Sequence, residues 1–236
     1  MEPIIVIPTY NEKENIGPLI KAVFKEIPGC RVMVVDDNSP DKTAEEVKGL
    51  QYDFSNLILF ERPGKEGLGR AYIAAFRKII AEFPDAGCVI TMDADFSHDP
   101  AYLKDMVKLA SDHDLVIGSR YIKGGGTTGW ELRRRLLSWG GNVYCRSITG
   151  MPAHDCTGGF NCFGMEWLKK LDLEKLLSYT GYAFEMAFKY NLWRRGAKIK
   201  ELPIIFKNRT AGRSKISNQI IKEGFLTPWR LIFSRW

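Results

Sequence analysis

Carboxylate side chains end an apolar segment near the middle of this sequence, at a spacing that could hold a metal ion. Asp93 and Asp95 follow the apolar run 87–92, one residue apart, and a turn containing Pro100 comes next. Two neighbouring carboxylates repel each other unless a cation lies between them, and Mg²⁺ is bound by carboxylates together with substrate phosphates. Taken alone, an Asp-x-Asp sequence is more often a solvated turn, so its surroundings must decide.

Two other apolar segments also end in acidic residues. Glu12 follows the run 3–8, and Asp36 and Asp37 end the run 31–37. If these runs are parallel strands, their carboxyl ends meet at one edge of a sheet, where ligands bind in α/β folds. Such an edge could bind a ribose diol, a base edge and a metal. It would repel nucleotide phosphates without that metal or basic groups from elsewhere in the chain.

Basic residues are concentrated in the second half of the chain. The net charge is +6, but residues 1–118 contain 13 Lys and Arg against 20 Asp and Glu, whereas residues 119–236 contain 21 against 8. This division indicates that the second half meets anions, which could be phosphorylated substrates, nucleic acid or an acidic membrane surface. The candidate groups are Arg120, the cluster 133–135, and a loop with Arg209, Arg213 and Lys215.

The elements that would position these residues alternate along the first half. Apolar runs predict strands at 3–8, 31–37, 56–61, 87–92 and 114–119, and helical patterns lie at 14–26, 43–50, 70–82 and 100–111. Strands that are apolar on both faces and alternate with helices are typical of a mostly parallel sheet with helices on both faces. We therefore expect an α/β fold. The glycine-rich segment 62–69 matches neither common phosphate-loop motif, so it is either a tight connection or a backbone approach to a nucleotide.

The second half is less regular. A glycine-rich loop at 123–129 precedes helical patterns at 132–148, 165–177 and 182–195, a strand at 198–206 and an amphipathic tail at 218–236. No apolar run approaches the ~20 residues that span a bilayer, so we expect the tail to lie at a membrane interface or to be a final core helix. The five cysteines show no CxxC spacing, and the three histidines are scattered. Both observations disfavour a disulfide framework, a zinc cluster or a histidine metal triad. We also expect no signal peptide before the first strand.

Several motifs together resemble a known family. The segments 6–12, 35–41 and 92–95 are similar to the inverting glycosyltransferases of family 2, which have the GT-A fold. The later segments 96–100, 118–121, 155–160, 181–185 and 212–215 resemble dolichyl-phosphate mannose synthases and their polyprenyl-phosphate relatives. The resemblance covers nearly the whole chain.

The resemblance implies one GT-A catalytic domain, residues 1–236. Residues 1–119 would be a Rossmann-like half that binds the nucleotide sugar, 120–216 an acceptor half with mobile loops, and 217–236 an amphipathic helix that contacts a membrane. The implied reaction is inverting, metal-dependent transfer of mannose from GDP-mannose to dolichyl or another polyprenyl phosphate. An already ionised phosphate acceptor needs no strong general base.

The resemblance also assigns roles to residues. Asp93 and Asp95 would hold Mg²⁺ or Mn²⁺, and the catalytic residues would be Asp95, Arg120 and Arg134. The nucleotide sugar would be bound by Pro8, Tyr10, Glu12, Asp37, Asp93, Ala94, Asp95, Arg209 and Lys215, and the acceptor phosphate by Arg120, Arg134 and Ser138. Two positions depart from the pattern: Ser97 stands where some relatives have Gln, and Trp139 where many have a basic residue.

Alternative functions remain open at this point. The donor could be UDP-glucose or another nucleotide hexose, the product could be a polysaccharide, and a more distant alternative is a nucleic-acid-binding protein that uses the basic half. The last would leave the acidic sheet edge without a purpose. We expect a glycosyltransferase with no nucleic-acid partner, peripherally attached to the cytoplasmic face of a membrane, directly or through a membrane-anchoring partner subunit.

Overall fold

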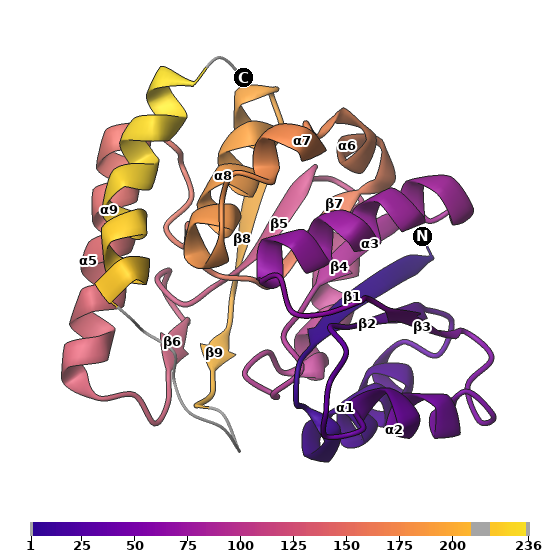
Figure 1. Ribbon diagram of the computed structural model, residues 1–236. Coiled ribbons are helices and arrows are strands. Elements are labelled where there is room, and N and C mark those ends of the chain that lie inside the picture. The colour runs from indigo at the N-terminus through magenta and orange to yellow at the C-terminus, as the bar shows by residue number, and fades with distance from the viewer. Residues whose placement is uncertain (1, 209–217, 235–236) are drawn as a thin grey trace.

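The computed structural model describes residues 2–208 and 218–234, which form helices around a central twisted sheet (Figure 1). The strands of this sheet lie in the order β3-β2-β1-β4-β7-β5-β8. Their bounds are β1 Pro3–Thr9, β2 Arg31–Asp36, β3 Leu57–Glu61, β4 Cys88–Thr91, β5 Leu115–Ser119, β7 Asn161–Gly164 and β8 Ile199–Pro203. All pairs are parallel except those of β7, so the predicted α/β class is confirmed.

Two apolar cores, one on each face of the sheet, explain why the strands are apolar throughout. Alternate side chains of a strand point to opposite faces, and in β1 Ile4 and Val6 enter one core while Ile5 and Ile7 enter the other. The first core is covered by α3 and α8, and the second by α1, α2 and α4. The helices concerned are α1 Lys13–Glu26, α2 Thr43–Leu50, α3 Leu68–Glu82, α4 Leu103–Leu109 and α8 Gly181–Arg194, with a 3₁₀ turn, η1, at Pro100–Tyr102.

The antiparallel strand β7 was not predicted. Its four residues pair with β4 on one side and with β5 on the other, so it joins the two parts of the sheet. A strand this short gives little periodicity, and Gly158 and Gly159 directly before it read as a turn. Its consequence for the site is direct, because β7 places the segment 155–160 beside the ends of β4 and β5.

Two of the predicted elements are wrong in their extent. The strand predicted at 198–206 divides at Pro203 and Ile204: β8 ends there, and β9, Ile205–Phe206, pairs instead with β6, Gly126–Thr127, in a second small sheet. The helix predicted at 165–177 divides into α6, Met165–Lys170, and α7, Leu173–Leu176. Asp172 accepts the backbone N–H of Lys175 and thereby caps the second helix, which explains the break.

Helices α5, Leu132–Thr149, and α9, Asn218–Phe233, lie side by side at one end of the molecule (Figure 1). Their contact is aromatic: the Tyr144 and Phe225 rings stack at 4.9 Å, and Trp229 Nε1 donates to Tyr144 Oη at 2.9 Å. Leu231 and Thr227 of α9 are buried, whereas Phe225, Leu226, Trp229 and Phe233 are exposed. One face of α9 therefore packs on the protein and another faces outward. Among the described residues, no helix is both long and apolar enough to cross a membrane.

Candidate active site

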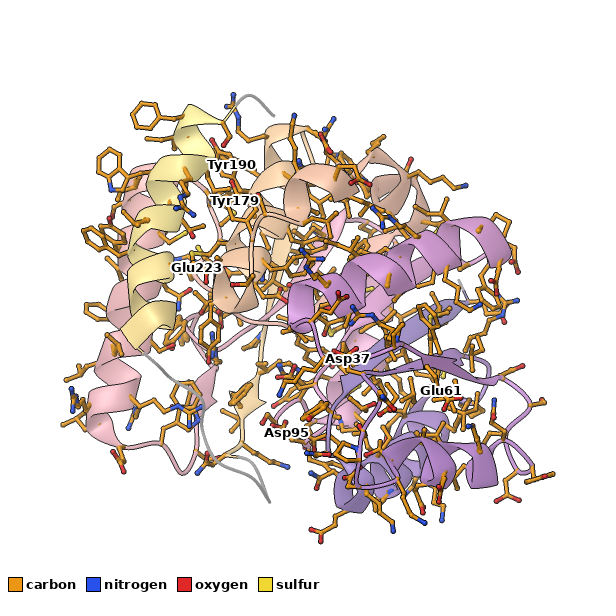
Figure 2. All side chains as sticks on the ribbon, viewed as in Figure 1. Asp37, Glu61, Asp95, Tyr179, Tyr190 and Glu223 are labelled. Atoms are coloured by element: carbon orange, nitrogen blue, oxygen red, sulfur yellow. The ribbon has the colours of Figure 1, made fainter. Side chains whose placement is uncertain are left out.

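The predicted acidic edge exists. Asp37 directly follows β2, Asp93 and Asp95 follow β4, and Figure 2 shows Asp37 and Asp95 on the same side of the sheet, where the strands end. The neighbouring Asp36 has a structural role, because its carboxylate accepts hydrogen bonds from Ser39 N–H (2.8 Å), Ser39 Oγ (2.6 Å) and Thr9 Oγ1 (2.9 Å). These bonds shape the turn after β2, in which Asp37 lies at the acidic edge of the sheet.

The loop after β4 holds its two carboxylates by local hydrogen bonds. Asp95 is 3% exposed, and its Oδ1 accepts the Ser97 N–H at 3.0 Å. The Asp93 N–H donates to His98 Nδ1 at 2.9 Å. Phe96, between Asp95 and Ser97 in the chain, has φ +59°. A non-glycine residue adopts this left-handed conformation only when its surroundings impose it. The loop is therefore built to present Asp93 and Asp95 in one arrangement.

The chemistry of this loop fits a divalent cation that is shared with a phosphorylated substrate. Mg²⁺ is commonly bound through only one or two carboxylates, and waters and phosphate oxygens complete its octahedron. Ser97 Oγ is buried beside them and has no hydrogen-bond partner within the described residues, so it is available as a further oxygen donor. No cluster of three or more His, Cys, Asp or Glu side chains that could enclose a metal occurs in the described part of the chain. The residues fit an open cation site and do not fit a closed structural one.

The residues expected to bind the nucleoside lie around the end of β1. Lys65, from the glycine-rich segment 62–69, places its Nζ 3.9 Å from the centroid of the Tyr10 ring, and Glu12 Oε2 accepts from Asn15 Nδ2 at 2.8 Å. Pro8 lies in β1 itself, and Ala94, between Asp93 and Asp95 in the chain, is buried. The 62–69 segment thus reaches the acidic edge, which favours the interpretation that its backbone approaches a ligand.

Asp37 has a buried partner that the sequence analysis missed. Arg62 Nη1 lies 2.5 Å from Asp37 Oδ1, and Arg62 Nη2 lies 2.6 Å from Glu66. Burial raises the pKa of the Asp37 carboxyl, although the charge of Arg62 opposes that shift. Arg70 Nη1 also lies 4.0 Å from Glu66 Oε1, so two guanidinium groups serve these two carboxylates.

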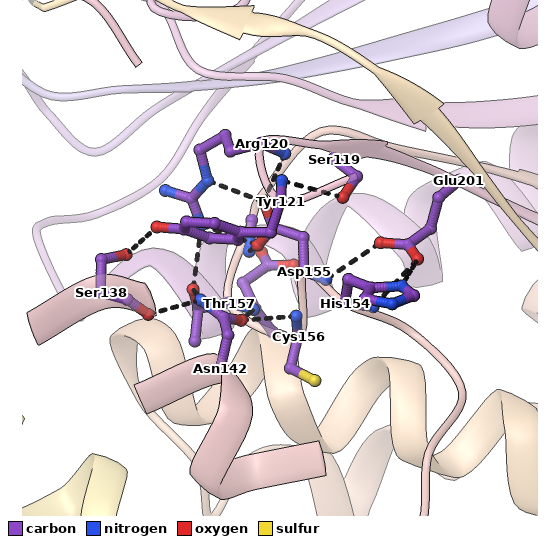
Figure 3. Close-up of polar contacts among 12 residues, drawn as sticks. Ser119, Arg120, Tyr121, Ser138, Asn142, His154, Asp155, Cys156, Thr157 and Glu201 are labelled. Carbon is purple, nitrogen blue, oxygen red and sulfur yellow. Dashed lines mark hydrogen bonds and ion pairs between the residues drawn. The ribbon is translucent and has the colours of Figure 1, made fainter. Parts of the chain in front are cut away.

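Arg120, directly after β5, forms a buried ion pair with Asp155 (Figure 3). Its Nε donates to Asp155 Oδ2 and its Nη2 to Asp155 Oδ1, both at 2.7 Å, and its backbone N–H donates to Oδ2 at 3.0 Å. Burial by itself would raise the pKa of Asp155, but Arg120 outweighs burial and holds that pKa below its ordinary value. Both groups are therefore charged, and the guanidinium is held rigidly.

Further hydrogen bonds tie this pair to α5 (Figure 3). Arg120 Nη2 also donates to Thr157 Oγ1 at 3.0 Å, and Asn142 Nδ2 donates to the same oxygen at 3.1 Å. Asn142 Oδ1 accepts the backbone N–H of Cys156 at 2.7 Å. Ser138, predicted to meet the acceptor phosphate, accepts from Tyr121 Oη at 2.7 Å. The turn before β7 and the helix α5 are thereby fixed relative to Arg120.

Arg134 lies near this pair, above an indole ring. Its Cζ is 3.8 Å from the Trp130 ring centroid, and Arg120 Cζ is 5.6 Å from the same ring. A guanidinium over an indole face is stabilised by the ring quadrupole, and here one ring carries two of them. No role was predicted for Trp130: Arg134 stands only four residues away, but Arg120 and Phe206 reach the ring from distant segments.

A groove with a volume of about 310 Å³ lies between α5, α8 and α9. Its walls are mainly apolar residues and glycines, with a few hydroxyl groups and the guanidinium of Arg134. The lining residues are Trp130, Arg134, Leu137, Ser138, Gly140, Gly141, Tyr144, Thr157, Tyr182, Met186, Gly224 and Phe225. A guanidinium in a mainly apolar lining suits a ligand that has an anionic head and a hydrocarbon tail.

The segment 155–160 contacts a buried polar side chain, Lys189. Lys189 Nζ donates to the Gly158 carbonyl at 2.5 Å and lies 3.3 Å from Glu185 Oε2, which also accepts from Asn161 Nδ2 at 3.0 Å. Burial raises the pKa of Glu185. These residues were not predicted, although Glu185 and Lys189 stand one helical turn apart in α8. The predicted Arg209 and Lys215 lie outside the described residues.

Comparison with solved structures assigns the fold. A glucosyl-3-phosphoglycerate synthase from Mycobacterium tuberculosis, in complex with Mn²⁺, UDP and phosphoglyceric acid, superimposes with a TM-score of 0.71 at 16% identity, over 100% of this chain and 80% of that one. A mannosyltransferase from Pyrobaculum calidifontis in complex with GDP-Man and Mn²⁺ matches with a TM-score of 0.65 at 18% identity, over 97% and 64%. The fold is that of the GT-A glycosyltransferases.

Sequence comparison is more specific. The model of the glycosyl transferase family 2 matches residues 4–172, and the chain belongs to that family and is a glycosyltransferase. It is 35% identical to an undecaprenyl-phosphate mannosyltransferase of Micrococcus luteus over 238 residues, covering 100% of this chain and 96% of the relative. It is 36% identical to a polyprenol monophosphomannose synthase of Mycolicibacterium smegmatis over 222 residues, covering 93% and 83%.

Proposed function

We propose that this glycosyltransferase transfers mannose from GDP-mannose to the phosphate of a polyprenol such as dolichyl phosphate, with inversion at the anomeric carbon. The observation that supports this most strongly is the groove, whose lining combines Arg134 with mainly apolar residues. Its Trp130 also contacts Phe206, whose ring meets His98 of the acidic loop. A sugar acceptor would need hydroxyl-binding polar groups along the groove, whereas a polyprenyl phosphate needs one anion site and a hydrocarbon channel.

On the donor side, the acidic edge would bind the nucleotide sugar. Asp93 and Asp95 would hold Mg²⁺ or Mn²⁺, which supplies a positive charge that stabilises the leaving diphosphate. Tyr10, Glu12 and Asp37 would border the nucleoside, with Pro8 and Ala94 as the apolar floor. Arg209 and Lys215 would add positive charge to the diphosphate, in line with their predicted role.

On the acceptor side, the arginines would bind and orient the nucleophile. An anion beside Trp130 would meet Arg134 and the fixed guanidinium of Arg120, with the Ser138 hydroxyl near the same ring. The phosphate oxygen is already ionised at neutral pH, so attack on the anomeric carbon requires no proton transfer to a side chain. The contribution of these residues is to hold two anions together and to align the reacting oxygen.

The outer faces of α5 and α9 would meet the membrane that holds the lipid acceptor. Both helices carry exposed apolar residues, of which Leu137 and Phe225 also line the groove. The set is Leu132, Leu136, Leu137, Trp139, Val143, Phe225, Leu226, Trp229 and Phe233. Arg133, Arg135 and Arg146 are exposed on α5 as well, and basic side chains around an apolar face favour an anionic membrane surface. The proposal is peripheral attachment to the cytoplasmic face, and a membrane-anchored partner subunit is a further way to reach it.

A transfer assay tests the proposal. Radiolabelled GDP-mannose, UDP-glucose and UDP-GlcNAc are each incubated with the protein, a polyprenyl phosphate in detergent and Mg²⁺ or Mn²⁺, and the organic phase is counted. We expect label from GDP-mannose in the lipid, abolished by EDTA. If only UDP-glucose labels the lipid, the transferred sugar is glucose, and the reaction class stays as proposed. No lipid-linked label from any donor would refute the proposal.

A further inference from the structure

A buried imidazole lies directly behind the first carboxylate of the acidic loop. His98 is 1% exposed, its Nδ1 accepts the Asp93 N–H at 2.9 Å, and its Nε2 lies 3.9 Å from Asp93 Oδ2. His98 therefore touches both the backbone and the carboxylate of the same residue. His98 is not among the residues proposed above to contact the sugar donor or the polyprenyl phosphate.

The hydrogen bond decides the protonation of this ring. A backbone N–H can only donate, so Nδ1 must accept, and a neutral imidazole then carries its hydrogen on Nε2. That N–H is the one near the Asp93 carboxylate.

The ring is held in place from two sides. It stacks on Phe160 with 4.8 Å between ring centroids, and the edge of Phe206 meets it at 5.4 Å. Strand β9, which carries Phe206, is bonded to the same loop: Lys207 N–H donates to the Ser97 carbonyl at 3.3 Å, and Lys207 Nζ pairs with Asp99 at 2.7 Å. Rotation of the imidazole would require both rings to move, so its orientation is fixed by packing.

We propose that His98 is a positioning residue that sets the orientation of the Asp93 carboxylate for the divalent cation. The imidazole holds the Asp93 backbone through Nδ1, and its Nε2 lies 3.9 Å from Oδ2, so the buried ring would limit how this carboxylate turns when it holds a cation. Carboxylates that bind metals are commonly oriented by such neighbours, and removal of the neighbour weakens metal affinity about 10- to 100-fold. This inference rests on the proposed cation site at Asp93 and Asp95.

Two substitutions each remove one of the two contacts of the ring. His98→Asn keeps an acceptor near the position of Nδ1 but has no group at Nε2, and His98→Gln can place a donor near Nε2 but loses the acceptor at Nδ1. The readout is Mn²⁺ affinity in the presence of GDP, and in parallel UDP, measured as free Mn²⁺ by electron paramagnetic resonance. His113→Asn is the matched control, because that ring lies in the turn after α4 and contacts the Leu109 carbonyl instead.

We expect both His98 variants to bind Mn²⁺ about 10- to 100-fold more weakly than the wild type at a temperature where circular dichroism shows them folded. The control should stay within about twofold of the wild type, a limit well below that expected loss. If the His98 variants do not fold, Phe206→Leu replaces them, because it keeps an apolar side chain and removes the ring edge; it should still weaken Mn²⁺ binding.

The outcomes separate this inference from the proposed function. If the wild type binds Mn²⁺ with a nucleotide and the folded variants bind it equally well, the positioning role is wrong and the cation site stands. If the wild type binds no Mn²⁺ with either nucleotide, the cation site fails and the inference fails with it.

Discussion

Two buried Arg–Asp pairs, one in each half of the chain, show how the same two side-chain types can shift a carboxyl pKa in opposite directions. In the N-terminal half, Arg62 is shared by Asp37 and Glu66, and Glu66 also lies 4.0 Å from Arg70. In the C-terminal half, Arg120 forms an ion pair with Asp155 through two side-chain bonds and one backbone bond. The pKa of Asp37 is raised, whereas the pKa of Asp155 is lowered.

The difference lies in the number and geometry of the contacts. Burial favours the neutral carboxyl in both cases. Asp155 has a bidentate Arg120 partner, backbone donors from Arg120 and Gly158, and the nearby charge of Lys189, which together outweigh burial. The single Arg62 contact and one backbone bond at Asp37 do not. The acidic edge also carries Asp93 and Asp95, which suits a cation. Arg120 and Asp155 balance each other's charge, and Arg134 lies over the same indole ring as Arg120, which suits an anion. Tertiary partners therefore set the charge of each region.

The largest effect is expected when one carboxylate of the acidic edge is removed. Asp95→Asn should lower transfer on the order of 10³-fold, because the amide cannot balance the cation's charge. The radiolabel assay measures the rate, and Asp105→Asn, an exposed acid on α4, is the control. A near-normal rate in Asp95→Asn would contradict the cation site.

Stability measurements sharpen the contrast between the two pairs. Asp155→Ala leaves the Arg120 guanidinium buried without its acid, and loss of one partner of a buried pair costs about 3–5 kcal/mol. Arg62→Ala should cost less, about 1–3 kcal/mol, because Asp37 can take up a proton. Urea unfolding at pH 7 gives both values. Equal losses would show that the two pairs do not differ as described.

The positive charge in the groove lining is tested by a substitution of Arg134 on α5. Arg134→Ala should raise KM for polyprenyl phosphate about tenfold, the effect of losing one charge-assisted hydrogen bond, and leave the KM for the sugar donor unchanged. Arg133→Ala is a matched control, since Arg133 is exposed on the neighbouring position of the same helix. Similar effects of the two substitutions would indicate general attraction of anions and not a site at Arg134.

The apolar part of the groove is tested by filling it. A side chain at Gly141 would meet no atom within 4 Å of its Cβ, so Gly141→Leu can enter the groove without a clash at that atom. We expect a several-fold higher KM for a long polyprenyl phosphate and little change for a short water-soluble phosphate ester. Gly49→Leu on α2, which is equally unobstructed, controls for the added leucine. Equal effects on both acceptors would place the lipid chain elsewhere.

The smallest effect is a difference in acid stability. The pKa of Asp155 is lower in the folded protein than in the unfolded chain, so its stabilisation is complete above the unfolded value near 3.9 and is lost as the pH falls toward the folded pKa. Asp155→Asn lacks this contribution. Between pH 4 and pH 2 the wild type should therefore lose more free energy of unfolding than Asp155→Asn, as measured by urea titrations. Parallel curves would contradict the lowered pKa.

The acidic edge was largely predictable because its acids follow strand ends. Asp37 directly follows β2, Asp93 and Asp95 come shortly after β4, and a parallel sheet brings such ends together. The region around Arg120 was less predictable. Asp155 lies 35 residues from Arg120, and Trp130 contacts Arg120 from another segment, so no local spacing reports either contact. The four residues of β7, which bring Asp155 to Arg120, were missed for the same reason.

The sequence by itself determined the α/β fold, the family, the acidic edge and the uneven distribution of charge, because periodicity and strand-end motifs are local properties. Only the tertiary structure decided which charges are paired and which face a substrate. It gave Arg62 to Asp37, Arg120 to Asp155 and His98 to Asp93, and it formed the groove between α5, α8 and α9. Those outcomes depend on burial and on contacts between distant segments, which the order of residues does not display.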